Sequence, residues 1–366
     1  MTSITKPPVR HPALLTNALG LTKRDYEGAM STLCAGCGHD SVTAALIQAC
    51  FELDVAPHMT AKLSGIGCSA KTTAYFAKQA HGLNGVHGRM PSLASGAHAA
   101  NRELLCIGVS GDGDSLSIGL GQLCHAIRRN VRMLYVLENN GVYGLTKGQF
   151  SASADVGSTS KRGTANTQQP IDPVLLALTL GATFVARSFS GDKGQLVPIL
   201  KAGLLHDGFA IVDVISPCVS FNDHDGSTKS YRFTREHAHD VAPIDLVPVR
   251  REARATEAKD QAGNGDSAAA AYTAAATVVT MPDGSVVRFR PVDESHDPTD
   301  RDAAYAHVRA LRERGEVATG LLYVDPGTSP SMHEANDTVA EPLARLPYES
   351  LCPGSGELAK FMDELK

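Results

Sequence analysis

The chain has 366 residues, of which 43% are hydrophobic and 20% charged, so it is long enough to bury a sizeable core in one large domain with extensions. Its formal net charge is −5 and its basic residues are dispersed, which excludes the electrostatic footprint of a nucleic-acid-binding protein. No apolar run reaches the roughly 18 residues of a membrane span, and residues 1–26 lack the apolar centre of a signal peptide, so we expect a soluble, cytoplasmic protein.

The spacing of apolar residues predicts helices that alternate with strands. The runs at 104–110 and 131–137 are continuously apolar, which is typical of a parallel sheet covered on both faces. The fold class is therefore α/β, a mostly parallel sheet with helices on both faces, and the strand at 209–215 is expected to complete it. In chain order, we expect helices at 41–53, 71–79, 92–102, 115–128, 173–180 and 193–204, and strands at 59–63, 104–110, 131–137, 183–187 and 209–215.

Other stretches depart from this alternation. Residues 148–169 are polar and rich in Ser, Thr and Gly, which indicates either a solvated loop or a segment that orders over a ligand or a partner. Beyond residue 225 the sequence predicts, in order, a helix or linker of mixed charge at 250–277, a hairpin around Asp-Gly at 281–287, a helix at 303–314 and a strand at 320–325.

Two polar motifs stand at the ends of two consecutive predicted strands. They are Gly111-Asp112-Gly113-Asp114 and Asn139-Asn140-Gly141-Val142. The glycines of the first allow backbone amides to approach an anion at a helix N-terminus, although the motif by itself is also an ordinary turn. Because one helix separates the two strands, Asp112 and Asn140 lie at the carboxyl ends of adjacent parallel strands, where open α/β sheets bind ligands. Asp112, Asn140 and a carbonyl near Val142 suffice to hold the Mg²⁺ of a diphosphate.

Four cysteines stand where apolar runs begin or end: Cys34 and Cys37 of a C-x-x-C turn, Cys68 and Cys218. Four thiolates at one end of a sheet could hold a [4Fe-4S] cluster. A zinc site that uses His39, a redox disulfide within the C-x-x-C turn and simple buried cysteines are the alternatives, and spacing does not choose between cluster and zinc. Eight cysteines without a signal peptide favour metal binding over a disulfide framework. The other four, Cys50, Cys106, Cys124 and Cys352, have no apparent chemical role.

From residue 34 to about residue 225 the chain resembles the β subunits of 2-oxoacid:ferredoxin oxidoreductases, and it is most similar to the long 2-oxoglutarate form. One departure is Ala35, where the family usually has proline. The resemblance rests on Cys34-x-x-Cys37-Gly38-His39, Gly65-Ile66-Gly67-Cys68, His87-Gly88-Arg89, the two strand-end motifs, Gly144 to Gln149 and Ser216-Pro217-Cys218.

This resemblance implies a thiamine diphosphate-binding fold and three cofactors, thiamine diphosphate, Mg²⁺ and a [4Fe-4S] cluster. The cluster is implied at Cys34, Cys37, Cys68 and Cys218, and Mg²⁺ at Asp112, Asn140 and the Val142 carbonyl. Substrate contacts are implied at Lys71, Arg89, Leu145 and Lys147, with cations for the carboxylates of 2-oxoglutarate. The remaining cofactor-binding residues that it implies are Gly38, His39, Ile66, Gly67, Cys68, Ser69, Gly111, Gly113, Asp114, Gly144 and Leu145.

The implied reaction is the reversible oxidative decarboxylation of 2-oxoglutarate with coenzyme A to succinyl-coenzyme A and CO₂, with electrons passed through the cluster to ferredoxin. The family's activating glutamate lies in a pyrimidine-binding half that this chain lacks, so an α subunit is an implied partner. Alternatives are a pyruvate or branched-chain 2-oxoacid:ferredoxin oxidoreductase subunit, a cluster-free thiamine decarboxylase, and a non-catalytic zinc-binding module.

The expected organisation has four parts. Residues 1–30 form an N-terminal arm, and residues 31–248 form the domain for thiamine diphosphate, Mg²⁺ and the cluster. Residues 249–280 are a linker or helix, and residues 281–366 are a C-terminal extension that packs on the core or on the α subunit.

Overall fold

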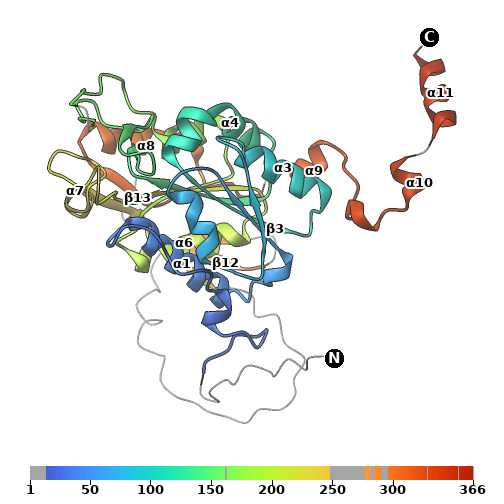
Figure 1. Cartoon of the computed structure of the whole chain (residues 1–366), viewed down its shortest axis with the longest axis horizontal. Helices are drawn as coiled ribbons and strands as arrows, with labels where there is room; N and C mark the ends of the chain where they lie inside the picture. The colour runs from blue at the N-terminus through green and yellow to red at the C-terminus, as the bar shows by residue number, and fades with distance from the viewer. Residues whose placement is uncertain are drawn as a thin grey trace.

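A mostly parallel sheet forms the centre of the protein (Figure 1). The structure is a computed structural model, and it describes residues 14–160, 163–247, 277–280, 284–289, 296–327, 329–352 and 354–365. Within these residues the sheet has eight strands, in the order β2 (His81–Asn84), β1 (Thr60–Ser64), β3 (Leu105–Gly111), β4 (Met133–Asn139), β8 (Phe209–Ile215), β7 (Phe184–Phe189), β13 (Val317–Val324) and β9 (Ala238–Ala242).

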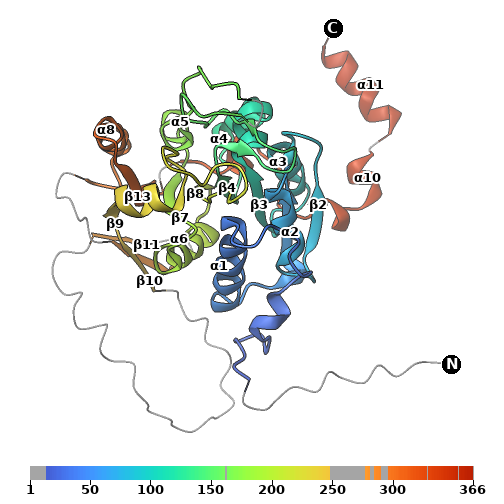
Figure 2. The same ribbon diagram turned by 60° about the vertical axis from the view of Figure 1, so that its left-hand side comes forward.

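Helices cover both faces of this sheet, as the apolar strands require. One face carries α1 (Gly38–Glu52) and α6 (Lys193–Leu205), and Figure 2 shows both helices below the strands. Successive side chains of a strand point to opposite faces of the sheet. Val136 of β4 therefore packs toward α1 and α6, while Tyr135 packs on the other face. That opposite face carries α3 (Met90–Ala100), α4 (Leu120–Arg128), α5 (Pro173–Leu180) and α8 (Arg301–Glu313).

Most of the expected core elements are confirmed, but two helices differ. The helix expected at 115–128 consists of a π-helical turn, η4 (Gly113–Ile118), followed by α4. The break falls at Gly119, where a Cβ would lie 2.7 Å from the Gly88 carbonyl oxygen, so the two backbones can meet only without a side chain there. The helix expected at 71–79 is only the short turn η3 (Ser69–Lys71) and α2 (Thr72–Tyr75).

The expectation that the strand at 209–215 completes the sheet was wrong, because the chain returns to the sheet twice. After α7 (Tyr231–His237), β9 forms one edge, and β13 inserts between β9 and β7, antiparallel to β7. The opposite edge strand, β2, was not expected either, since all four of its residues are exposed and carry no apolar pattern. The strand expected at 320–325 is therefore part of the core sheet.

Smaller elements complete the described chain. β11 (Thr277–Thr280) pairs antiparallel with β12 (Val286–Phe289), which confirms the strand pairing expected around 281–287 although its turn at 281–283 lies outside the described residues. β10 (Ile244–Val247) pairs with β12, and β5 (Val142–Tyr143) pairs with β6 (Gln149–Phe150). The helix or linker expected at 250–277 lies almost wholly outside the described residues. Short helical turns are η1 (Lys23–Tyr26), η2 (Pro57–Met59), α9 (Met332–Ala335) and η6 (Leu343–Arg345).

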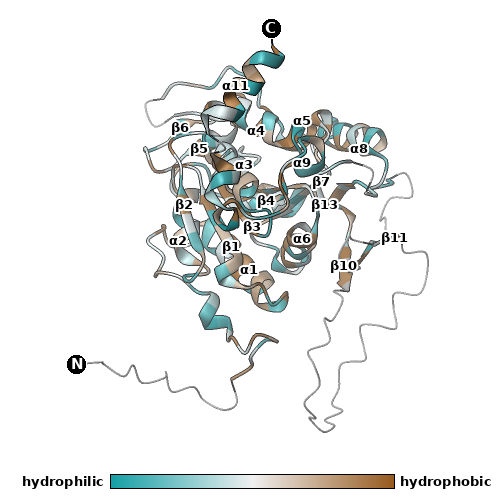
Figure 3. Cartoon of the chain, turned by 90° about the vertical axis from the view of Figure 1, so that its right-hand side faces the viewer, coloured by the Kyte–Doolittle hydropathy of each residue, from teal (hydrophilic) through white to brown (hydrophobic). Residues whose placement is uncertain are grey.

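The C-terminal helices α10 (Tyr348–Leu351) and α11 (Ser355–Glu364) project away from the sheet and its helices in both views (Figures 1 and 2). Neither helix has a buried residue. Figure 3 shows apolar residues along α11, and Leu358, Phe361 and Met362 are all more than half exposed. Among the described residues, none of the helices has the length and apolar character needed to cross a bilayer.

Candidate active site

The parallel strands β1, β3, β4 and β8 are neighbours in the sheet, and their carboxyl ends lie along the same side of it. The segments 65–69, 111–114 and 140–145 follow the first three, and they line a cavity of about 410 Å³. Apart from the cluster cysteines Cys34, Cys37 and Cys218, Gly38 is the one predicted cofactor-binding residue outside this lining. The predicted residues that line the cavity are His39, Ile66, Gly67, Cys68, Ser69, Gly111, Asp112, Gly113, Asp114, Asn140, Val142, Gly144 and Leu145.

The glycines of the first motif allow neighbouring side chains to pack closely on its backbone beside this cavity. A Cβ on Gly113 would lie 2.5 Å from the ring of Tyr143, whose hydroxyl donates to the Gly113 carbonyl at 2.9 Å. Asp114 has a different role, because its two oxygens accept from the Gly88 N–H at 2.7 Å and the Ser110 hydroxyl at 2.9 Å. It therefore fixes the turn at Gly88 beside the cavity.

Asp112 is almost fully buried, and burial raises the pKa of its carboxyl, against which the hydroxyls of Ser151 and Ser153 act by hydrogen bonding. Its Oδ2 accepts from both hydroxyls and from the Gly141 N–H at 3.0 Å. A divalent cation in the adjoining cavity would favour the ionised carboxylate. The environment of Asp112 thus suits a cation ligand better than an isolated charge.

Asn140 is held in one orientation. Its Oδ1 accepts from the Val142 N–H at 3.0 Å, its Nδ2 lies 3.5 Å from Nε2 of His39, and its carbonyl accepts from Asn222 Nδ2 at 2.8 Å. Asp112, Asn140 and Val142 all line the same cavity, so these oxygen-bearing groups fit the few protein ligands that Mg²⁺ takes beside a diphosphate.

The four predicted cysteines line a second cavity, of about 300 Å³. A Cβ on Gly144 would lie 3.4 Å from the Cys68 sulphur and 3.5 Å from the Cys218 sulphur, so these two sulphurs flank Gly144. The two cavities adjoin, because five residues line both of them: His39, Cys68, Asn140, Gly144 and Leu145.

None of the four cysteines forms a disulfide. Burial raises the pKa of Cys37 to about 12 and raises the pKa values of Cys68 and Cys218, so the thiols keep their protons unless a positive centre binds them. Within the described residues, no three His, Cys, Asp or Glu side chains are arranged to hold a single metal ion. Four sulphurs spread around one cavity suit a [4Fe-4S] cluster, in which each cysteine binds a different iron, better than one tetrahedral zinc ion.

Gly38 places the C-x-x-C turn against the loop that carries Cys218. Its N–H donates to the Pro217 carbonyl at 3.2 Å, and a Cβ on it would lie 2.5 Å from the Ser216 hydroxyl. Only glycine allows the start of α1 to approach this closely. Gly38 thus acts on the cysteine site through packing.

His39 and Glu138 form a buried pair beside both cavities. Nδ1 of His39 lies 2.6 Å from the Ser216 hydroxyl and 3.4 Å from Oε2 of Glu138, which also accepts from Thr72. Burial lowers the pKa of His39 to about 4 and raises the pKa of Glu138 well above its usual range. Burial thus favours the uncharged form of both groups, which disfavours an ion pair between them.

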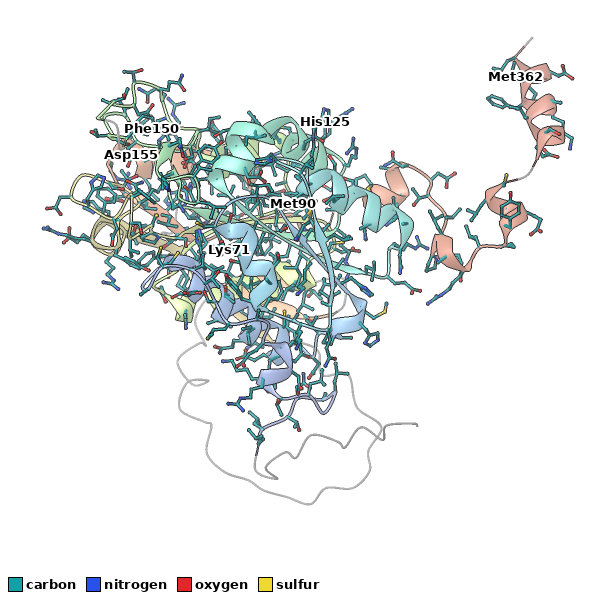
Figure 4. All side chains as sticks on the ribbon, in the orientation of Figure 1. Lys71, Met90, His125, Phe150, Asp155 and Met362 are labelled. Carbon is teal, nitrogen blue, oxygen red and sulfur yellow. The ribbon has the colours of Figure 1, made fainter. Side chains whose placement is uncertain are left out.

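The predicted substrate residues do not all meet. Lys71 and Lys147 line the cysteine cavity, and Leu145, which is half exposed, lines both cavities. Nζ of Lys71, which Figure 4 labels, lies 3.4 Å from the Thr32 hydroxyl. Arg89 is exposed and lines neither cavity, so its role stays a prediction.

Several residues of the site were not found from the sequence. Ser151 and Ser153 bind Asp112, Glu138 packs beside His39, and Ser216 contacts His39. The sequence signal for them is weak: the polar stretch 148–169 indicates either a solvated loop or an ordering segment, and it does not show which hydroxyls point inward.

The fold and this site together define a class. An α/β sheet whose strand ends present a Gly-Asp-Gly turn and an Asn pair to one cavity is a thiamine diphosphate-binding domain, and residues 65–214 match the family model described as thiamine pyrophosphate enzyme, C-terminal TPP binding domain.

Comparisons with three known proteins indicate which thiamine diphosphate-binding family the chain resembles. The chain is 40% identical over 211 residues to the 2-oxoacid:ferredoxin oxidoreductase subunit beta of Saccharolobus solfataricus, covering 57% of this chain and 68% of that one. It is 39% identical over 191 residues to the 2-oxoglutarate oxidoreductase subunit KorB of Mycobacterium tuberculosis, covering 52% of this chain and 51% of that one. A solved structure, the 2-oxoglutarate:ferredoxin oxidoreductase of Magnetococcus marinus, is similar with a TM-score of 0.69 and 27% identity, over 93% of this chain and 97% of that one.

The chain belongs to the β subunits of the 2-oxoacid:ferredoxin oxidoreductases. It is thus an oxidoreductase subunit with a thiamine diphosphate-binding domain, and the family and fold class expected from the sequence are confirmed.

Proposed function

We propose that this chain is the β subunit of an enzyme that oxidatively decarboxylates 2-oxoglutarate with coenzyme A, giving succinyl-coenzyme A and CO₂ and passing electrons to ferredoxin. The observation that carries the proposal is the shared wall between the cofactor cavity and the cysteine cavity. Relatives named 2-oxoglutarate synthase subunit KorB, and a similar structure with 2-oxoglutarate, coenzyme A and succinyl-CoA bound, support it. The reaction is reversible in principle, and the cytoplasmic location expected from the sequence is part of this proposal.

The proposal assigns each cofactor to a set of residues. Asp112, Asn140 and the Val142 carbonyl hold Mg²⁺, and the four cysteines that line the second cavity hold a [4Fe-4S] cluster. Thiamine diphosphate in the first cavity supplies the electron sink for decarboxylation. The chain's own groups position the diphosphate, exclude water from the buried carboxylate and keep the cysteines beside the cofactor.

An α subunit completes the site in this proposal. Ile118 and Leu145 line the cofactor cavity while remaining half exposed, which leaves apolar surface at its mouth for another chain to cover. Within the described residues, neither cavity is lined by a glutamate that could act on the cofactor. Both features support the expectation that the activating carboxylate comes from a partner.

Anaerobic co-purification with the α subunit, followed by methyl viologen reduction, tests the reaction. With coenzyme A present, we expect dye reduction with 2-oxoglutarate and little with pyruvate, and loss of activity in Asp112→Ala. Preference for pyruvate would support the proposed reaction class but contradict 2-oxoglutarate as the substrate. Activity only with branched-chain 2-oxoacids would have the same meaning. No reduction with any 2-oxoacid, in a complex that contains iron and thiamine diphosphate, would contradict the proposed function.

A further inference from the structure

Two serines of the polar stretch after β6 turn inward onto Asp112. Ser151 and Ser153 are buried, and they lie in a turn that the Ala154 N–H closes by donating to the Ser151 carbonyl at 3.1 Å. Within this turn both hydroxyls reach the same carboxylate oxygen. The Ser153 hydroxyl lies 2.5 Å from Oδ2 of Asp112, and the Ser151 hydroxyl donates to the same oxygen. Figure 4 labels Phe150 and Asp155, which flank this segment.

The two oxygens of the Asp112 carboxylate are therefore not equivalent. Oδ2 accepts from two hydroxyls and from the Gly141 N–H, which fills the directions from which a carboxylate oxygen accepts hydrogen bonds. Oδ1 has one long contact, 3.5 Å from the Asn140 N–H. Because Asp112 lines the cofactor cavity, Oδ1 is the oxygen left for a cation there.

A buried polar network contacts Ser153. The Ser153 hydroxyl lies 2.9 Å from Oδ1 of Asn139, whose Nδ2 donates to Oδ1 of Asp213 at 3.0 Å. Oδ2 of Asp213 accepts from Nε of Arg187 at 2.7 Å, and Arg187 also donates to Asp172 at 2.6 Å. The network ends on an ion-paired arginine that is itself buried, so Ser153 has little freedom to move.

Hydrogen bonds at Asp155 also fix the position of this polar segment. Oδ1 of Asp155 accepts from the Thr228 hydroxyl at 2.6 Å and its Oδ2 from the Thr228 N–H at 2.9 Å. Thr228 lies in the segment that follows Cys218, so residues 151–155 connect the Asp112 carboxylate with the loop that leads away from the cysteine site. These residues are an ordered part of the site.

We propose that Ser151 and Ser153 are positioning residues for the divalent cation, which fix Oδ2 of Asp112 so that Oδ1 faces the cation. This inference rests on the proposed magnesium site at Asp112. Partners of metal ligands commonly change metal affinity or activity about 10- to 100-fold when removed. Neither serine lines the cofactor cavity, so we expect saturating metal to restore turnover when both are removed.

The experiment uses the anaerobic α/β complex, which keeps its iron but is freed of Mg²⁺ and then titrated with Mn²⁺. Electron paramagnetic resonance measures the bound Mn²⁺. We expect Ser151→Ala/Ser153→Ala to raise the Mn²⁺ dissociation constant by about 10-fold or more, with near-normal turnover at saturating Mn²⁺. Ser158→Ala is the matched control, because the Ser158 hydroxyl donates to the Asp155 carbonyl and not to Asp112. Iron content and the melting temperature without metal show that the variants fold.

The outcomes separate the two claims. Wild-type Mn²⁺ affinity in the double variant, with loss of affinity in Asp112→Ala, would overturn the positioning role and keep the magnesium site. Unchanged affinity in Asp112→Ala as well would contradict the magnesium site of the proposed function. An equal loss in Ser158→Ala would show a general effect of the stretch and also overturn the assignment to these two hydroxyls.

Discussion

At the scale of single residues, Gly144 is the position where a side chain would reach both cavities. Its Cβ position is in ordinary van der Waals contact with the sulphurs of Cys68 and Cys218. We therefore expect Gly144→Ala to keep its iron, whereas Gly144→Val, with two further methyl groups in the same space, loses most of it. Iron and acid-labile sulphide per chain in the anaerobic complex measure this difference.

Gly121→Val is the control for that pair, because nothing lies within 4 Å of a Cβ there. Full iron content in Gly144→Val would mean that the cluster does not lie beside this glycine. Loss of iron in Gly121→Val would point to a general folding defect.

The second prediction at this scale concerns Glu138. Because burial raises its pKa well above the usual range and His39 is neutral, Glu138→Gln should lower the free energy of unfolding by less than about 1 kcal/mol. The amide oxygen still accepts from Thr72, whereas Glu138→Leu removes that acceptor and should cost more. Thermal melting of the complex compares the variants. A loss of about 3 kcal/mol or more in Glu138→Gln would indicate a buried ion pair with His39 instead.

The sequence could predict that the proposed ligands lie together, because each one stands at a strand end or in a spaced cysteine motif. Asp112 and Asn140 close consecutive strands, which by itself places them side by side in a parallel sheet. The residues that orient these ligands could not be predicted, since Ser153 reaches Asp112 through a loop whose path depends on tertiary contacts. Ser151 and Ser158 have the same local chemistry, and only the fold distinguishes them.

At the scale of elements, the C-terminal region is two parts with different roles. β13 is buried inside the sheet and α8 packs over it, whereas α10 and α11 have no buried residue. Ending the chain after Leu346 should therefore leave the melting temperature within about 2 °C of the full chain. Ending it after Phe289 removes β13 and uncovers the β7 edge and its apolar face, so that variant should be insoluble.

Solubility and melting temperature of the two truncated chains, each produced with the α subunit, test this division. A soluble, cooperatively melting chain that ends after Phe289 would show that β13 is dispensable. Collapse of the chain that ends after Leu346 would show that the projecting helices contribute to folding.

The same contrast explains what the sequence revealed about elements. β3 and β4 are continuous apolar runs between turns and were expected within a few residues, while β2 has no apolar pattern because it lies exposed at the edge. The break between η4 and α4 depends on a backbone contact between Gly119 and Gly88, which local periodicity cannot show.

At the scale of the whole molecule, buried neutral histidines should make stability depend on pH. Burial lowers the pKa values of His98 and His206 from 6.5 to about 4, and Arg102 and Arg132 act on His98 in the same direction. The unfolded chain takes up protons below about pH 6.5 and the folded chain does not until about pH 4, so stability falls as the pH falls through this range. Each histidine contributes about 2 kcal/mol of this loss at pH 5.

Melting temperatures between pH 7 and pH 5 measure the effect. His98→Gln and His206→Gln should each flatten the pH dependence even if they lower stability at pH 7. An unchanged slope in both variants would mean that these histidines are already charged in the folded protein.

At this scale, in the function proposed above, electrons released at the cofactor cavity leave through a cluster at the four cysteines beside it. The most direct measurement is electron paramagnetic resonance of the anaerobic α/β complex, loaded with thiamine diphosphate and Mg²⁺ and mixed with 2-oxoglutarate and coenzyme A. We predict the signal of a reduced [4Fe-4S] cluster. The signal should be absent when either 2-oxoglutarate or thiamine diphosphate is omitted, and it should also be absent in Cys218→Ser. Turnover of 2-oxoglutarate by a complex without iron would contradict this electron path. An unchanged cluster signal in Cys218→Ser would also contradict it.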